Sequence, residues 1–347
     1  MKFLKYTVLI LGCLIWACGL NPTLLGLVGR YKLITDGYQY GDLYRMANLS
    51  AFKDPKKPCP AYTPPAKAQS AKAQSAKKVH LYIIGDSFTE EQRVGHQDFA
   101  VDAYTRVHWS EMLHVKLDTS ETNILLLESV ERHFRQHLEA PVSLILPDSA
   151  TFIQKVVSSK FMNKLDDAFN GKQAQDRFEA LLFQNEAFLK VKEWKADFTY
   201  HFFHRVNTSV TLVDNDRSVV SYMDTDTPHI TSAFSKIRDS ELDSLVLNLK
   251  RSKDSAMKMG FDFVALSIIP NKVSVIHPEY DAYNRLIERV YQHSGLPMPY
   301  IDVLADFRKM GTASYLKGDS HWTCEAQTLW LNKVNALINN FVAPENI

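Results

Sequence analysis

The chain has 347 residues, enough for one large domain or for a domain with an insertion. It is 46% hydrophobic and 23% charged, which is the composition of a folded globular protein. A formal net charge of +1 gives no support for a nucleic-acid partner, which would favour a basic surface. Four cysteines are too few for a disulfide scaffold.

The N-terminus has the pattern of an export segment. Two lysines precede an apolar run that continues, with one interruption, to Val28. Residues 6–28 are long enough for one membrane span, so an uncleaved anchor over residues 1–30 is the favoured interpretation. A lipoprotein is an alternative, because Ile15-Trp16-Ala17-Cys18 resembles its modification box, and a cleaved signal peptide is another. Each interpretation predicts that residues 31–347 lie on the periplasmic or extracytoplasmic side of the cell membrane.

Residues 31–78 separate this segment from the main domain. The tyrosine-rich stretch 31–53 is either a juxtamembrane segment, packed on the domain or on a membrane partner, or a folded N-terminal extension. Residues 55–78 are rich in Pro, Ala and Lys and contain a direct repeat, which predicts a linker. Cys59 and Cys324 are the two cysteines beyond the apolar segment, and they could pair or stay free.

From residue 79 to the C-terminus, apolar strands alternate with helical stretches. This alternation predicts an α/β domain over residues 79–347, with a doubly wound, mostly parallel sheet of the flavodoxin-like kind. Ligands of such sheets bind at the carboxyl ends of the strands. The expected strands are 79–84, 123–127, 261–269 and 300–303, and the expected helices are 95–117 (with loops), 131–138, 242–259, 280–293 and 325–341.

Residues 141–240 interrupt the alternation and predict an insertion. A long helical pattern covers 153–203, and a hairpin follows between residues 210 and 222. The insertion either covers the catalytic edge and shapes a substrate cleft, or is a structural cap. Within it, the aromatic run Tyr200–His204 could stack on sugars, but packing in a core is the favoured interpretation.

Two segments far apart in the chain read as the halves of one active site. Gly85-Asp86-Ser87-Phe88 follows the first strand, and Asp319-Ser320-His321-Trp322 precedes the last helix. A serine at the end of a buried strand can present its hydroxyl, a histidine can take the proton, and an aspartate can hold the histidine tautomer. We therefore predict Ser87 as nucleophile, His321 as general base and Asp319 as the orienting carboxylate.

These segments resemble the first and last motif blocks of the SGNH/GDSL hydrolases. Trp322, and the single residue between Asp319 and His321, make the alginate O-acetyltransferase-like branch the closest match, over residues 79–340. The resemblance implies an SGNH hydrolase-like fold and an exported serine esterase or O-acetyltransferase. Such an enzyme acts on acyl groups of a cell-envelope polysaccharide, needs an acyl donor but no cofactor, and often works beside a membrane-bound O-acyltransferase.

The chain departs from the family pattern in its oxyanion hole. A Gly-x-Asn-Asp block, which usually supplies the donors, is missing from the sequence. The backbone N–H of Ser87, at a predicted helix start, is the first expected donor. Arg132 and Asn271 each follow a strand and are candidates for the second, although Arg132 could instead pair with a carboxylate and Asn271 could set a turn. The missing block also leaves a second function open, a non-catalytic SGNH-fold protein that binds glycan or scaffolds an envelope complex.

His133 and His137 lie four residues apart on a predicted helix, a spacing that could bind zinc. The sequence offers no evident third ligand, so a solvated helix face is the favoured interpretation and no metal site is predicted.

Overall fold

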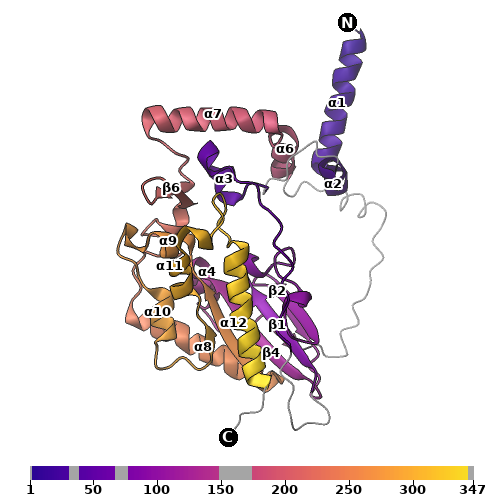
Figure 1. The fold of residues 1–347 in the computed structure, drawn as a ribbon. Coiled ribbons are helices and arrows are strands. Elements are labelled where there is room, and N and C mark those ends of the chain that lie inside the picture. Colours follow the sequence, from indigo (N-terminus) through magenta and orange to yellow (C-terminus); the bar gives the residue numbers. More distant parts are fainter. Residues whose placement is uncertain (1, 31–38, 67–76, 148–173, 343–347) are drawn as a thin grey trace. The chain divides into compact units, whose positions relative to one another are not determined.

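The computed structural model describes residues 2–30, 39–66, 77–147 and 174–342 (Figure 1). Contacts divide the chain into two compact units. The N-terminal unit comprises Met1–Lys56 and Ile153–Asn207, and the α/β unit comprises Lys57–Phe152 and Thr208–Ile347. This division differs from the expected one, because the predicted insertion is shared between the two units.

A five-stranded parallel sheet forms the centre of the α/β unit, in the order β2-β1-β4-β8-β9. The residues of β4 from Ile124 to Leu127 are all at most 2% exposed, as expected for a parallel strand covered on both faces. The α/β class with a mostly parallel sheet is therefore confirmed. The strands are β1 (Val79–Gly85), β2 (Ala103–His108), β4 (Thr122–Val130), β8 (Phe263–Ile269) and β9 (Tyr300–Ile301).

Helices pack on this sheet, and Figure 1 shows α12 lying along its strands. Trp330 of α12 donates from Nε1 to Ser267 Oγ of β8 (2.9 Å), and Phe341 stacks on Phe263 at 4.1 Å between ring centroids. An amphipathic helix is thus held by a buried hydrogen bond and by apolar burial together. The helices are α4 (Glu131–His137), α8 (Asp239–Met259), α9 (Lys272–Ile276), α10 (Leu286–Tyr291), α11 (Leu304–Met310) and α12 (Cys324–Val342).

Two of the expected helices are wrong in whole or in part. Residues 95–117 form the edge strand β2 and the short strand β3 (Leu113–Val115), which pairs with β5 (Ile145–Pro147). The β-branched and aromatic residues of β2 favour a strand once β1 offers an edge for pairing. The helix expected over 280–293 shrinks to α10, because Arg285 adopts a left-handed conformation with φ of 56°.

The predicted hairpin is confirmed as β6 (Val210–Val213) paired antiparallel with β7 (Ser218–Ser221). Its turn holds Asp214, Asn215 and Asp216 at positive φ, which Asp and Asn tolerate better than most residues. Val220 packs in a buried cluster with Phe234 and Val273, so this part of the insertion belongs to the core of the α/β unit. Whether the insertion shapes a substrate cleft stays a prediction.

Among the described residues, one helix, α1 (Lys2–Leu20), is long and apolar enough to cross a membrane, and a signal sequence would pass the same test. Asn21 ends α1 and starts α2 (Pro22–Arg30), because its Oδ1 accepts the Thr23 and Leu24 N–H groups at 2.9 and 3.1 Å. The candidate span is therefore α1, rather than an unbroken helix over 6–28.

Residues 39–53 form a folded extension, the second of the two alternatives for this stretch. They pack on α7 (Glu186–Phe203), which follows α6 (Ala174–Phe183). Tyr44, in α3 (Asp42–Ala47), donates to Glu193 (2.5 Å), and Lys53 lies 2.9 Å from both Glu186 and Glu193.

The expected core packing of Tyr200–His204 is wrong, since Phe202 is 69% exposed.

The start of the predicted linker is fixed to the α/β unit. Cys59 forms a disulfide with Cys324 at the first residue of α12, which settles the pairing that the sequence left open. Tyr62 donates from its hydroxyl to Asn332 Oδ1 of the same helix (2.8 Å). Residues 67–76, which contain most of the repeat, lie outside the described residues.

Candidate active site

The structure brings the three predicted triad residues together. Ser87 Oγ lies 2.8 Å from His321 Nε2, and His321 Nδ1 lies 2.5 Å from Asp319 Oδ1. The Asp319 side chain is 1% exposed and His321 is 9% exposed, whereas Ser87 is only partly buried. The three side chains are thus within hydrogen-bond reach in the order expected for a nucleophile, a base and an orienting carboxylate.

The loop that carries Asp319 and His321 is held from several sides. The ammonium group of Lys272 donates to the backbone carbonyls of Leu316, Lys317 and Asp319 at 2.8, 3.0 and 3.2 Å. The Tyr315 hydroxyl donates to the Pro270 carbonyl at 2.5 Å. The β8–α9 connection therefore fixes the loop that carries Asp319 and His321.

Aromatic rings pack beneath the base. The Phe88 ring lies 4.8 Å from the His321 ring and 5.0 Å from Trp322, which it meets edge to face. Phe88 and Trp322 are both nearly inaccessible to solvent. Phe88 and Trp322, which directly follow Ser87 and His321, therefore hold the two loops together by apolar burial.

The turn that carries Ser87 rests on a buried carboxyl group. Glu128 Oε2 accepts the Asp86 N–H (2.7 Å) and the Thr89 hydroxyl (3.0 Å), and it is 0% exposed. Burial, with the nearby charge of Asp86 as the second cause, raises the pKa of Glu128 to about 8. A Cβ on Gly85 would lie 2.2 Å from Thr89 Oγ1 and 2.7 Å from Glu128 Oε2, which explains the glycine before Asp86.

One expected feature of the oxyanion hole is absent. Ser87 begins a three-residue 3₁₀ turn, Ser87–Thr89, in place of the predicted helix start. A helix dipole of any size needs several aligned peptide units, so the dipole argument for the Ser87 N–H is wrong. The N–H group itself remains the nearest candidate donor, because it belongs to the nucleophile.

Arg132 and Asn271 meet at the carboxyl ends of β4 and β8. The backbone N–H of Arg132 donates to Asn271 Oδ1 (3.1 Å), and Arg132 Nε lies 3.4 Å from Asp224 Oδ1. The guanidinium group is thus paired with a carboxylate, which was the alternative reading for Arg132. Asn271 begins α9 as its N-cap residue, but its side chain makes no capping hydrogen bond there.

The Asn271 amide is the better candidate for a second oxyanion donor. Because the Arg132 N–H can donate only to an oxygen of the Asn271 amide, Oδ1 of Asn271 faces it and Nδ2 points elsewhere. Asn271 is 0% exposed, and its Nδ2 has no hydrogen-bond partner among the described residues. Its neighbours Pro270 and Lys272 both contact the loop of the base.

Sequence reasoning missed a second buried acid, Glu131. Its Oε2 accepts the Asn271 N–H (2.9 Å) and its Oε1 accepts the Tyr283 hydroxyl (3.0 Å). Burial raises the pKa of Glu131 to about 7. Glu131 therefore sets the position of Asn271. The only sequence signal was an acidic residue directly after an apolar strand.

Asp86, which directly precedes Ser87, also belongs to a second group of side chains that contains two histidines. Ligand atoms of Asp86, His133 and His137 all lie within 4.8 Å of one another. Trp109 stacks on the His137 ring, with 4.3 Å between centroids, and donates from Nε1 to the Glu128 carbonyl (2.6 Å). Asp86 therefore offers the third ligand atom that the sequence did not reveal, and the three side chains are of the types that bind transition metals.

Comparison with known proteins identifies no relative. No family model matches the chain, no curated protein matches it, and no solved structure matches it.

Proposed function

We propose that the chain is a serine esterase or O-acetyltransferase that acts on acyl groups of a cell-envelope polysaccharide. The observation that supports it best is the contact of Ser87 Oγ with His321 Nε2 at 2.8 Å, continued by the contact of His321 Nδ1 with Asp319 Oδ1 at 2.5 Å. The polysaccharide substrate comes from the motif resemblance and from the export segment.

In this proposal Ser87 Oγ attacks the acyl carbonyl carbon while its proton passes to His321 Nε2. The resulting imidazolium is stabilised by Asp319, which accepts the hydrogen bond from Nδ1. The negative charge on the former carbonyl oxygen faces the Ser87 N–H, with Asn271 Nδ2 as the second donor. His321 then protonates the departing alcohol or carrier, which leaves an acyl-enzyme.

The second half of the reaction decides between hydrolysis and transfer. His321 takes a proton either from water, which releases the free acid, or from a sugar hydroxyl, which forms a new ester. The family resemblance and the apolar α1 support transfer, with a membrane-bound O-acyltransferase supplying the acyl group. The triad would carry out the same proton transfers in hydrolysis and in acyl transfer.

The test is active-site labelling followed by kinetics. A fluorophosphonate should label the wild-type chain at Ser87, and Ser87→Ala should lose the label. The same variant should lose hydrolysis of a small acetyl ester by on the order of a thousand-fold or more, with an unchanged circular dichroism spectrum. Ser244→Ala is a matched control, because Ser244 is exposed and bonds only within α8.

The alternative is a non-catalytic protein of SGNH-like fold that binds glycan or scaffolds an envelope complex. The missing Gly-x-Asn-Asp block and the pairing of Arg132 with Asp224 favour it. An unlabelled Ser87 in folded wild-type protein, together with saturable binding of an acetylated envelope polysaccharide, would replace the catalytic proposal by this one.

A further inference from the structure

Asp86, His133 and His137 have the spacing of ligands around one ion. Asp86 Oδ1 lies 3.5 Å from His133 Nδ1 and 3.8 Å from His137 Nε2. Both separations are too long for a good hydrogen bond. Two donors that each lie about 2.0–2.1 Å from a tetrahedral Zn²⁺ are about 3.3 Å apart, so these two separations are close to those around a shared ion. All three ligand atoms lie within 4.8 Å of one another.

The remaining polar atoms of this cluster are already held. His137 Nδ1 lies 2.9 Å from Ser129 Oγ, and Asp86 Oδ2 accepts the Val130 N–H at 2.8 Å. Metal-binding histidines and carboxylates are oriented by such outer contacts. They leave His137 Nε2 and Asp86 Oδ1 facing each other.

We propose that Asp86, His133 and His137 bind one divalent transition-metal ion of the Zn²⁺ type. The side chain of His133 is 40% exposed, which leaves one side of the ion open to water or to a ligand. The ion would tie the end of β1, which continues into Ser87, to α4. This site does not depend on the esterase proposal.

The metal site is tested on the full chain carrying Ser87→Ala, without a histidine tag, by calorimetry with Zn²⁺ and by visible absorption with Co²⁺. One equivalent should bind. Affinity should fall at least about 100-fold with His133→Ala and about 10–100-fold with Ser129→Ala, which removes an outer contact. His114→Ala, an exposed histidine on β3, should bind like the parent. Absence of saturable binding, or equal binding by folded His133→Ala protein, overturns the proposal.

A different observation concerns α7, which exposes an apolar stripe. Phe188, Val191, Trp194, Phe198 and Phe202 are spaced three or four residues apart and therefore lie on one face of the helix. Each is at least 47% exposed, and Trp194 reaches 75%. An exposed apolar surface of this extent on one helix face marks an interaction site.

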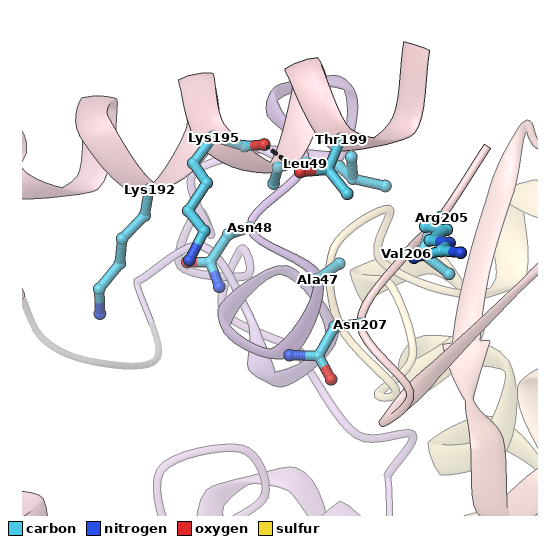
Figure 2. Close-up of a pocket in the computed structure, with 10 residues that line it drawn as sticks. Ala47, Asn48, Leu49, Lys192, Lys195, Thr199, Arg205, Val206 and Asn207 are labelled. Atoms are coloured by element: carbon cyan, nitrogen blue, oxygen red, sulfur yellow. Dashed lines mark hydrogen bonds between the residues drawn. The ribbon is translucent and has the colours of Figure 1, made fainter. Parts of the chain in front are cut away.

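The same helix also lines a basic cavity within the N-terminal unit (Figure 2). It has a volume of about 360 Å³, and Lys192, Lys195 and Arg205 are among the ten residues that line it. No carboxylate is among those ten. Figure 2 shows Lys195 extending from α7 toward Asn48. The cavity therefore suits an anionic group.

Continuity with α1 identifies the occupant. Arg177 of α6 donates to the Gly19 carbonyl near the end of α1 (2.8 Å), and the Phe178 ring packs on Gly19 so closely that a Cβ there would lie 2.2 Å from it. Only two residues separate α6 from α7. The helix with the aromatic stripe thus follows directly on the helix that contacts the candidate membrane span.

We infer that α7 lies in the lipid–water interface, with its aromatic stripe against the acyl chains and the basic cavity binding phosphate headgroups of anionic phospholipids. Trp and Phe beside Lys are typical of interfacial helices, and basic residues are attracted to an anionic membrane surface.

The test uses the full chain in vesicles of brominated phosphatidylcholine, alone or mixed equimolar with phosphatidylglycerol. The parent protein for this test is Trp16→Phe, which removes the tryptophan of α1. In this parent, bromine should quench part of the tryptophan emission. Adding Trp194→Phe should abolish the quenched part. Quenching should increase with phosphatidylglycerol. Lys195→Gln should lose most of that increase, whereas Lys250→Gln, exposed on α8, should keep it.

Two outcomes count against the interfacial helix. Emission from Trp194 that stays unquenched in both lipids would overturn the proposal and assign the stripe to a protein partner. Quenching that is equal in both lipids, and unchanged in Lys195→Gln, would overturn the headgroup site in the basic cavity.

Discussion

Asp319 holds His321 at two points, because Asp319 Oδ1 accepts both the ring Nδ1–H (2.5 Å) and the backbone N–H (2.8 Å) of His321. In Asp319→Asn the side-chain oxygen can keep the backbone contact while the amide group disturbs the tautomer. We expect kcat for a small acetyl ester to fall, but by less than in Ser87→Ala, with little change in KM. Wild-type kcat in this variant would remove Asp319 from the mechanism.

Gly85 should be the least replaceable residue of the Ser87 turn. An added Cβ would overlap Thr89 Oγ1, whose side chain is 0% exposed and cannot move into solvent. Gly85→Ala should therefore lower the free energy of unfolding by about 1–3 kcal/mol, the usual range for an overpacked core. Chemical denaturation measures it. Adding Thr89→Ala should restore part of the loss, and strictly additive effects of the two changes would contradict the steric explanation.

His80 should contribute to acid sensitivity. It lies on β1, its Nε2 is 2.9 Å from Thr105 Oγ1, and burial lowers its pKa although the nearby Glu121 offsets part of the effect. Below pH of about 6.5 the unfolded chain takes up this proton before the folded chain does, so stability falls as the pH falls. His80→Gln should reduce the difference in unfolding free energy between pH 7.5 and pH 5.5. The exposed-residue control His114→Gln should leave that difference unchanged.

Strands and helices whose positions depend on a local residue pattern could be predicted from the sequence. The apolar runs of β1, β4 and β8 are continuous, and a parallel sheet sends all their carboxyl ends to one edge. Ser87 and His321 could be predicted for this reason, since each lies within a few residues of a regular element. The edge strand β2 was missed because its side chains are all only partly buried and carry no strong apolar signal.

Features that depend on contacts between distant residues could not be predicted. Asp86 and His137 are brought together only when β1 pairs with β4, so the histidine spacing seemed to lack a third ligand. Tyr44 and Glu193 are 149 residues apart, and no periodicity reports such a pair. The aromatic run Tyr200–His204 was assigned to a core because apolar spacing on a helix is the same whether protein or another apolar phase covers it.

The disulfide should be the strongest single constraint on α12. Cys59→Ser frees the start of this helix from the segment before β1, and loss of such a bond typically costs about 2–5 kcal/mol. Thermal unfolding without reductant should show a lower midpoint for Cys59→Ser. Cys13→Ser removes an exposed, unpaired cysteine and should unfold like the wild type. Equal midpoints for all three proteins would mean that the bond does not stabilise the fold.

For the whole molecule, the disulfide and α1 point to the same compartment. Disulfides persist outside the cytoplasm, and α1 is long and apolar enough for a membrane span or a signal sequence. A fusion of alkaline phosphatase after residue 78 should therefore be active. An inactive fusion, together with full-length protein in the soluble cytoplasmic fraction, would contradict this orientation.

The Cys59–Cys324 bond also closes a covalent ring. The ring includes Ser87, Asp319 and His321, while α1 and α3 lie before it. A protease that cuts once between residues 59 and 324 would leave both halves of the site in one covalently joined molecule as long as the bond stays oxidised. The nicked chain should migrate as a single species on a non-reducing gel and separate into two fragments only after reduction. A single backbone break in this ring would therefore not separate Ser87 from His321.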